Sequence, residues 1–200
     1  MKVVSAPALF IDRDGVLNVD TGYPYRIEDL ELYSDLAALR LVQEAGFCLI
    51  VVTNQSGVGR GYCSLAQVEL FNQHLCSRLR RFGVQLNKDD FYICPHHPEA
   101  GCDCRKPKPA LFQRAARERD LDLSRSFAVG NSPSDLEAAS SAGVRAFLID
   151  RSRSSQANAV ASLSELSDLL LADPRDVRGA TSVVANGPAS ASIAGVKRRQ

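Results

Sequence analysis

Two carboxylates follow a short apolar run near the amino terminus. The run Ala8-Leu9-Phe10-Ile11 reads as a buried strand and leads into Asp12-Arg13-Asp14-Gly15. If the chain stays extended, side-chain alternation puts Asp12 and Asp14 on one side and turns Arg13 away. Two anions so close need a cation or a shared proton, so the pattern predicts a metal site, a general acid beside a nucleophile, or both. A polar turn that caps the next segment is the alternative for these residues alone.

A threonine and a glycine-rich segment follow the next apolar run. Thr53 and Asn54 come directly after residues 47–52, where a hydroxyl and free backbone amides can cradle a phosphate oxygen. The glycines of residues 57–61 lack the spacing of a dinucleotide-binding loop, and the first strand carries no such loop. We therefore expect them to let the chain turn beside a ligand, with Arg60 as an anion contact.

Three cysteines and a histidine gather within eleven positions. Cys94, His96, Cys102 and Cys104 form a Cys-x-His pair and a Cys-x-Cys pair around a short loop, a spacing that can close a tetrahedral zinc site. The alternatives are chance clustering of reduced cysteines and His97 in place of His96. Since so short a loop has no core of its own, we expect structural zinc to supply its folding energy.

Two more polar segments complete the set of candidates. Arg105 and Lys106 follow the last cysteine in a proline-rich turn, which is either a solvated surface or a phosphate clamp. Asn131 and Asp135 follow a fourth apolar run and offer oxygen ligands that suit magnesium. The alternative for Asp135 is a helix cap, in which Ser134 begins the helix and the carboxylate lies in its first turn.

Apolar runs alternate with helical patterns over most of the chain, and the polar clusters fall where the runs end. This alternation predicts an α/β fold with a doubly wound, mainly parallel sheet, whose strands present ligands at their carboxyl ends. We expect strands at 8–11, 47–52, 91–93, 127–130 and 144–149, helices at 36–45, 65–82, 110–119 and 134–142, and a further strand and helix within 159–171.

Length and composition indicate one domain of ordinary size. The 200 residues carry a formal charge of +1, which favours neither nucleic acid nor an anionic membrane as a partner. No long apolar segment indicates export or membrane insertion, so we expect a cytoplasmic protein, and a monomer. We place the catalytic domain at 1–171 and expect a disordered tail at 172–200, where Ala, Ser and Gly dominate.

The ordered clusters resemble the motifs of the haloacid dehalogenase superfamily of phosphotransferases over about residues 8 to 150. More narrowly, FIDRDG at 10–15, TNQSGVGRG at 53–61, CPHHP at 94–98 and CDCRKP at 102–107 resemble the D-glycero-D-manno-heptose 1,7-bisphosphate phosphatases. That family removes the C7 phosphate of a sugar bisphosphate during synthesis of nucleotide-activated heptose for lipopolysaccharide and surface glycans. The related histidinol-phosphatase domain shares the zinc loop and is the alternative substrate class.

The resemblance implies a role for each motif residue. Asp12 would be the nucleophile and Asp14 the general acid and base, while Thr53 and Lys106 hold the phosphoryl group. Asn54, Arg60 and Arg105 would contact the substrate. Mg²⁺ would bind Asp12, the Asp14 carbonyl and position 131, with Asp135 contributing directly or through water. Mg²⁺ and Lys106 would offset a repulsion of about 8 kcal/mol between a carboxylate and a phosphate dianion about 4 Å apart, at an effective dielectric constant near 20.

One position departs from the family pattern. The family usually has aspartate where this chain has Asn131, which leaves the metal site with one fewer negative charge. We expect Mg²⁺ to bind more weakly, and a non-catalytic zinc-stabilised scaffold of the same fold stays open as an alternative. The intervals between motifs leave no room for a separate cap domain.

Overall fold

The computed structural model describes residues 5–152 and 159–172, and their strands form one parallel sheet. The order β3-β2-β1-β4-β5-β6 means that the chain winds outward from β1 to β3, then crosses back to lie beside β1 again. This confirms the doubly wound α/β fold, in which ligands bind outside the carboxyl ends of the strands where the winding reverses. The strands are β1 (Ala8–Ile11), β2 (Cys48–Asn54), β3 (Phe91–Cys94), β4 (Phe127–Gly130), β5 (Arg145–Ile149) and β6 (Ala159–Val160).

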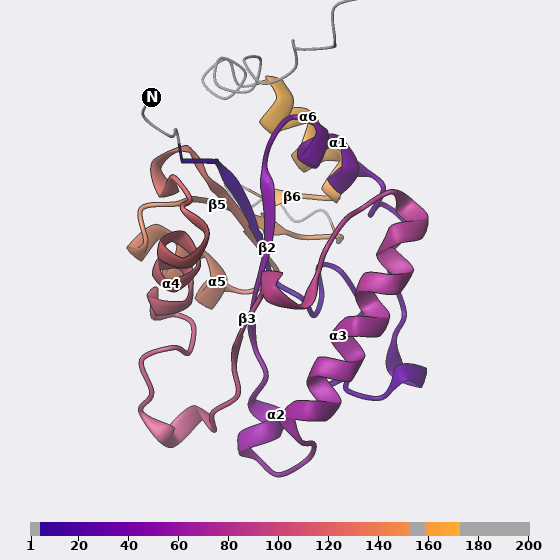
Figure 1. Cartoon of the computed structure of the whole chain (residues 1–200), viewed down its shortest axis with the longest axis vertical. Helices are drawn as coiled ribbons and strands as arrows, with labels where there is room; N and C mark the ends of the chain where they lie inside the picture. The colour runs from indigo at the N-terminus through magenta and orange to yellow at the C-terminus, as the bar shows by residue number, and fades with distance from the viewer. Residues whose placement is uncertain (1–4, 153–158, 173–200) are drawn as a thin grey trace, which may run out of the picture.

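Helices cover both faces of the sheet (Figure 1). On one face α1 (Ala38–Glu44), α3 (Leu65–Leu79) and α6 (Leu163–Ala172) pack against Leu9 and Ile11 of β1. On the other face α4 (Ala110–Arg119) and α5 (Pro133–Ser141) pack against Ala8 and Phe10. Because successive residues of a strand point to opposite faces, both faces of β1 are buried, which explains its unbroken apolar run.

Helix starts follow the capping chemistry of the sequence. Ser64 and Gln67 form a capping box at the start of α3, as the serine before that helical pattern indicates. The start predicted for α5 is wrong by one residue. Ser132, rather than Ser134, caps the helix, because Pro133 occupies the first helical position and Asp135 then reaches back to the Ser132 backbone.

Loops and short turns lie at the carboxyl ends of the strands, towards the lower end of Figure 1. The 18–33 loop includes a 3₁₀ turn at Ile27–Asp29 and is closed at its base by a bridge between Asn18 and Leu32. Residues 55–60 form a short helix, α2 (Ser56–Gly59), where the glycines led us to expect only a turn. Within the described residues these loops, and no separate domain, lie over the sheet edge.

The remaining short elements are 3₁₀ turns at Arg80–Phe82, Lys88–Asp90, Pro98–Ala100 and Leu123–Arg125. Among the described residues no helix is long and apolar enough to cross a membrane. The tail predicted at 172–200 lies outside the described residues, apart from Ala172, which ends α6. Residues 153–158, between β5 and β6, are also outside them.

Candidate active site

A buried lysine lies between two of the predicted carboxylates. Lys106 Nζ is 2.8 Å from Asp12 Oδ1 and 2.5 Å from Asp135 Oδ1, and it also donates to the Val52 carbonyl at 2.7 Å. The three charged side chains are 3%, 13% and 7% exposed. Asp135 Oδ2 accepts from the backbone and hydroxyl of Ser132, so this carboxylate both caps α5 and orients the lysine.

Burial and charge act in opposite directions on this group. Burial raises the pKa of Asp12 to about 7, with Lys106 opposing the rise and the carboxylates of Asp135 and Asp14 adding to it. Burial alone lowers the pKa of Lys106, but the two carboxylates outweigh it and leave that pKa above its usual value. The lysine therefore stays charged, and it is the group that makes an ionised Asp12 tolerable in the protein without a metal.

The prediction that Arg13 points away is wrong. β1 ends at Ile11, so the alternation of an extended strand no longer applies at Arg13. Its guanidinium turns back and donates from Nε and Nη2 to the two carboxylate oxygens of Asp14, each at 2.9 Å. Asn18 and Gln55 add one amide hydrogen bond each to the same carboxylate, at 2.9 and 2.8 Å.

Gln55 joins this carboxylate to the predicted phosphate cradle. Its amide nitrogen donates to Asp14 Oδ2 and also to Thr53 Oγ1, both at 2.8 Å. The Thr53 hydroxyl accepts this bond and so keeps its own hydrogen for another acceptor. Sequence reasoning missed Gln55 and Asn72, which accepts from Arg13 Nη1 at 3.0 Å, and the only signal for Gln55 was its place after Thr53 and Asn54.

The predicted substrate-binding residues differ in their surroundings. The Asn54 amide accepts from the Lys106 backbone nitrogen at 3.1 Å and donates to the Lys106 carbonyl at 3.2 Å. It therefore holds the Lys106 segment beside the end of β2. Arg105 Nη1 is buried with no hydrogen-bond partner among the described residues. A buried guanidinium nitrogen without an acceptor can donate to an anion, which is compatible with the predicted contact with substrate.

The turns after β1 and β4 touch each other. Gly15 has a left-handed backbone, with φ of +82°, and the Asn131 side chain lies where a Cβ at position 15 would be. The turn therefore requires glycine for its conformation and for the contact. This approach brings the Asn131 amide to the Asp12–Asp14 turn, and carboxylate with amide and carbonyl oxygens is a donor set that fits Mg²⁺.

The four predicted zinc ligands converge on one point. Cys94 Sγ and Cys104 Sγ lie 3.6 and 3.7 Å from Cys102 Sγ, and His96 Nδ1 lies 3.7 Å from Cys94 Sγ and 3.2 Å from Cys104 Sγ. A tetrahedron with Zn–S bonds of about 2.3 Å has sulfur–sulfur edges of about 3.8 Å, close to these distances. The donor atoms therefore fit zinc, and all four are protein atoms, as in a structural site.

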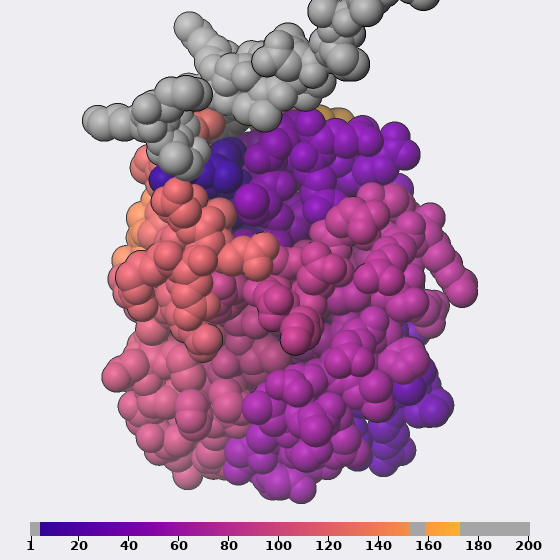
Figure 2. Space-filling view, viewed as in Figure 1, coloured from indigo at the N-terminus to yellow at the C-terminus, as the bar shows by residue number. Residues whose placement is uncertain are grey.

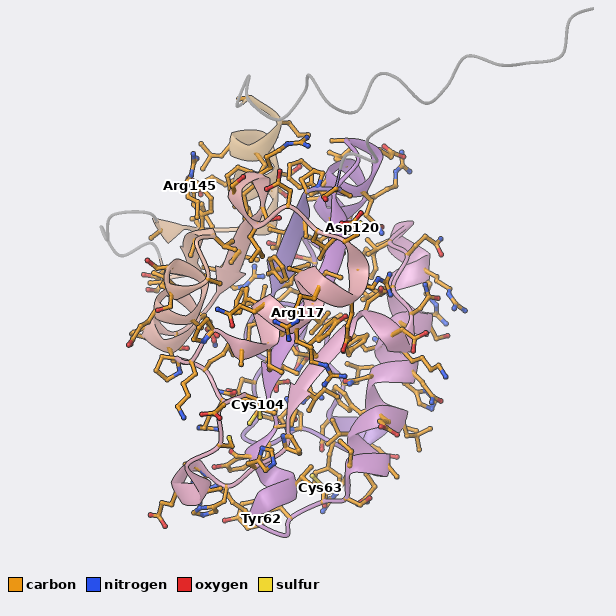
Figure 3. All side chains as sticks on the ribbon, turned by 60° about the vertical axis from the view of Figure 1, so that its left-hand side comes forward. Tyr62, Cys63, Cys104, Arg117, Asp120 and Arg145 are labelled. Atoms are coloured by element: carbon orange, nitrogen blue, oxygen red, sulfur yellow. The ribbon has the colours of Figure 1, made fainter. Side chains whose placement is uncertain are left out.

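The cysteine loop, residues 94–104, packs directly on α2. The backbone of His96 and His97 occupies the space that a side chain at Gly59 would need. Arg60 lies beside His97, with its Nη1 3.5 Å from His97 Nε2, and its guanidinium is 5.8 Å from the Tyr23 ring centre. Figure 2 shows the two segments side by side at the lower end of the molecule, where Figure 3 labels Cys104, Tyr62 and Cys63.

The structure thus divides the predicted residues into three groups. Asp12, Lys106 and Asp135 form one network, and Asp14 and Thr53 a second, joined through Gln55. The four predicted zinc ligands form the third. Arg60 makes no described contact with the first two groups and stays at the outer rim with His97.

Comparisons with known proteins find relatives that are named as hydrolases or phosphatases. A family model described as HAD-hydrolase-like matches residues 103–173. The D-glycero-beta-D-manno-heptose-1,7-bisphosphate 7-phosphatase of Haemophilus ducreyi is 41% identical over 152 residues, which cover 72% of this chain and 82% of that protein. The enzyme of the same name from Helicobacter pylori strain J99 is also 41% identical, with 72% and 82% covered.

Two solved structures are similar over most of their length. A putative HAD-like phosphatase from Mesorhizobium loti has a TM-score of 0.73 and 35% identity, with 84% of this chain and 85% of that one covered. D,D-heptose 1,7-bisphosphate phosphatase from B. bronchiseptica, in complex with magnesium and phosphate, has a TM-score of 0.73 and 29% identity. The match covers 82% of this chain and 98% of that one.

Proposed function

This chain belongs to the haloacid dehalogenase-like hydrolases, in the heptose 1,7-bisphosphate 7-phosphatase family, and from that premise we propose the reaction it carries out. It removes the C7 phosphate of D-glycero-D-manno-heptose 1,7-bisphosphate in a magnesium-dependent hydrolysis, as a step towards nucleotide-activated heptose. The observation that carries the chemistry is the buried ion pair between Lys106 and Asp12 at the carboxyl end of β1. The identity of about 40% to named phosphatases supports the substrate.

The proposed reaction has two steps at phosphorus. An Asp12 carboxylate oxygen attacks the phosphorus, the bond to the C7 oxygen breaks, and Asp14 gives a proton to the departing alkoxide. Water then attacks the phosphorus of the aspartyl phosphate, its proton passes to Asp14, and Asp12 is released with inorganic phosphate. Lys106 and the Thr53 hydroxyl donate to the phosphoryl oxygens throughout.

Two metals fit the donor atoms described above. Asp12, Asn131 and the Asp14 backbone carbonyl would hold Mg²⁺, with Asp135 as a further oxygen nearby. When bound, Mg²⁺ offsets the charge repulsion between Asp12 and the phosphate dianion. Cys94, His96, Cys102 and Cys104 would hold Zn²⁺ as a structural ion, which stabilises the loop that leads into Arg105 and Lys106.

Two arginines near the carboxyl edge of the sheet are the proposed substrate contacts. Arg105 offers a buried donor without an acceptor, which supports a contact with a phosphate or hydroxyl of the sugar. Arg60, at the outer rim with Tyr23 and His97, is placed to meet an anion farther from the reacting phosphorus. A bisphosphate offers such a second anion. We propose that the enzyme acts as a monomer in the cytoplasm, where its cysteines, all free in the described residues, stay reduced.

The test compares substrates and a nucleophile variant. Purified protein with Mg²⁺ is given heptose 1,7-bisphosphate or histidinol phosphate, and ³¹P NMR identifies which phosphate is lost. We expect release of the C7 phosphate from the heptose, at least about 100-fold faster than from histidinol phosphate, and no release by Asp12→Asn. Faster turnover of histidinol phosphate would reassign the substrate, and a folded protein inert towards both would support a scaffold.

A further inference from the structure

Arg13 is the largest side chain of the described core that is fully buried, and the proposed reaction gives it no role. Its side chain is 0% exposed although it carries a full positive charge. Burying a guanidinium is unfavourable unless it is paired and its donors are satisfied. The position of this charge, one residue from each of the two predicted catalytic carboxylates, therefore calls for an explanation.

The guanidinium is held from every side. Nη1 donates to Asn72 of α3 at 3.0 Å, and Nη2 donates to the Pro24 carbonyl of the 18–33 loop at 2.9 Å. Its carbon lies 4.6 Å from the centre of the Phe71 ring, also on α3. Contacts from a helix, a loop and an aromatic face leave the guanidinium one position, so its remaining donors point in fixed directions.

Those remaining donors fix the carboxylate of Asp14. Nε and Nη2 form a two-point contact with the two oxygens, and this geometry allows one orientation of the carboxylate plane. The Asn18 amide donates a second hydrogen bond to Oδ1, and the Gln55 amide donates a second one to Oδ2. Each oxygen thus has two donors, which are all that its two lone pairs can accept.

The same guanidinium also sets the orientation of Gln55. Arg13 Nη2 lies 2.9 Å from Gln55 Oε1, and its two hydrogens are shared among this oxygen, the Pro24 carbonyl and Asp14 Oδ2. Arginine has no acceptor, so the oxygen of the Gln55 amide must face Arg13. The amide nitrogen then faces Asp14 and Thr53 and donates to both. The Thr53 hydroxyl is consequently an acceptor towards Gln55 and has its hydrogen free for a phosphoryl oxygen.

We propose that Arg13 is a positioning residue of the catalytic site: it fixes Asp14 by direct contact and fixes the Thr53 hydroxyl through Gln55. The inference rests on the proposed phosphatase reaction, in which Asp14 exchanges protons with the leaving group and water. Each proton exchange at Asp14 displaces one amide donor, while the two-point contact with Arg13 keeps the carboxylate in place.

Two substrates with different leaving groups distinguish a positioning role of Arg13 from a role in fold stability alone. The parameter kcat/KM reports the steps up to departure of the leaving group. An alkoxide needs the proton of Asp14, whereas 4-nitrophenolate departs without one. We expect Arg13→Met, which replaces the guanidinium with an unbranched apolar side chain, to lower kcat/KM for the sugar bisphosphate about 10²- to 10³-fold. For 4-nitrophenyl phosphate we expect a loss below about 10-fold.

Two further variants complete the series. Arg13→Lys keeps the charge but lacks the planar guanidinium. We therefore expect it to be more stable than Arg13→Met, yet to show the same larger loss of kcat/KM on the sugar bisphosphate than on the aryl ester. Gln73→Ala changes an exposed side chain next to Asn72 and should match the wild-type protein on both substrates. If Arg13→Met does not fold, Asn72→Ala removes the acceptor of Nη1 and should show the same selective loss, at about 3- to 10-fold.

A crystal structure of Arg13→Met decides the geometry without an activity measurement. We expect the Asp14 carboxylate or the Gln55 amide to turn away from its present position. Equal losses of kcat/KM on both substrates, with Asp14 and Gln55 unmoved, would overturn the inference and leave Arg13 a structural residue. A wild-type protein that hydrolyses the aryl ester but not the sugar bisphosphate would count against the proposed substrate only, because the crystal structure still tests Arg13.

Discussion

Replacing Lys106 with methionine is the most informative change at the site. The substitution keeps an unbranched side chain, shorter by one atom, and removes the charge between Asp12 and Asp135. At 2.8 Å and an effective dielectric constant near 20, the attraction between Lys106 and Asp12 is about 6 kcal/mol before desolvation is counted. Breaking a buried pair from one side typically costs about 3 to 5 kcal/mol, because the other charge stays buried.

The loss acts on catalysis through the nucleophile. In the metal-free protein burial raises the pKa of Asp12 to about 7 while Lys106 opposes that rise, so without the lysine the pKa rises further and protonation of Asp12 competes with Mg²⁺ binding. A protonated carboxyl is a poor nucleophile, and the phosphoryl group loses a donor as well. We expect kcat/KM to fall about 10²- to 10⁴-fold, which corresponds to a loss of about 3 to 5 kcal/mol of transition-state stabilisation.

The assay is phosphate release from heptose bisphosphate as a function of pH, at a fixed Mg²⁺ concentration below saturation. We expect Lys106→Met to lower kcat/KM by that amount and to move the acid limb of its profile to higher pH. Lys88→Met, at an exposed lysine, is the control and should match the wild-type protein. A folded Lys106→Met protein within about tenfold of wild type, with an unchanged pH profile, would refute this account of the ion pair.

Three other changes test separate parts of the site. The pKa of Asp12 is raised on folding, so its contribution to stability is complete below about pH 4 and is lost as pH rises towards 7. Without Mg²⁺ but with zinc retained, the Tm of Asp12→Asn should rise relative to that of the wild type between these pH values. A constant difference in Tm would contradict the raised pKa of Asp12. Asn131→Asp restores a charge at the metal site and should lower the Mg²⁺ concentration for half-maximal rate about tenfold; an unchanged titration counts against a ligand at this position. Cys104→Ser removes a zinc ligand and should release zinc and lower the Tm by about 5 °C or more, so full zinc content by elemental analysis would contradict the assigned site.

The sequence predicted the limits of those helices and strands that are set by residues close by in the chain. The strand at Phe127–Gly130 and the helix at Ala110–Arg119 have the expected limits, because an apolar run and a proline before a helical pattern carry that information. Ser64 predicted the start of α3 for the same reason. The short helix Ser56–Gly59 was missed, since its two glycines favour turns and tertiary contact with the cysteine loop stabilises it.

The chemistry-bearing residues were easier to find than their contacts. Cys102, Lys106 and Asp12 became candidates because residue type and position near a strand end carry the signal, and the structure brings each of them beside other candidates. The fork between Arg13 and Asp14 was not predicted, because it depends on where β1 ends and on Asn72, 59 residues away in the chain. Contacts at such sequence separation leave no local pattern in a single sequence.

Covalent capture of the intermediate tests the central claim most directly. Borohydride reduces an aspartyl phosphate to homoserine, which tandem mass spectrometry locates in the chain. When the protein is mixed with Mg²⁺ and heptose bisphosphate and quenched with borohydride during turnover, we predict homoserine at position 12, and none without substrate. Sustained phosphate release with position 12 unmodified, or with homoserine at another position, would contradict the assignment of Asp12 as the nucleophile.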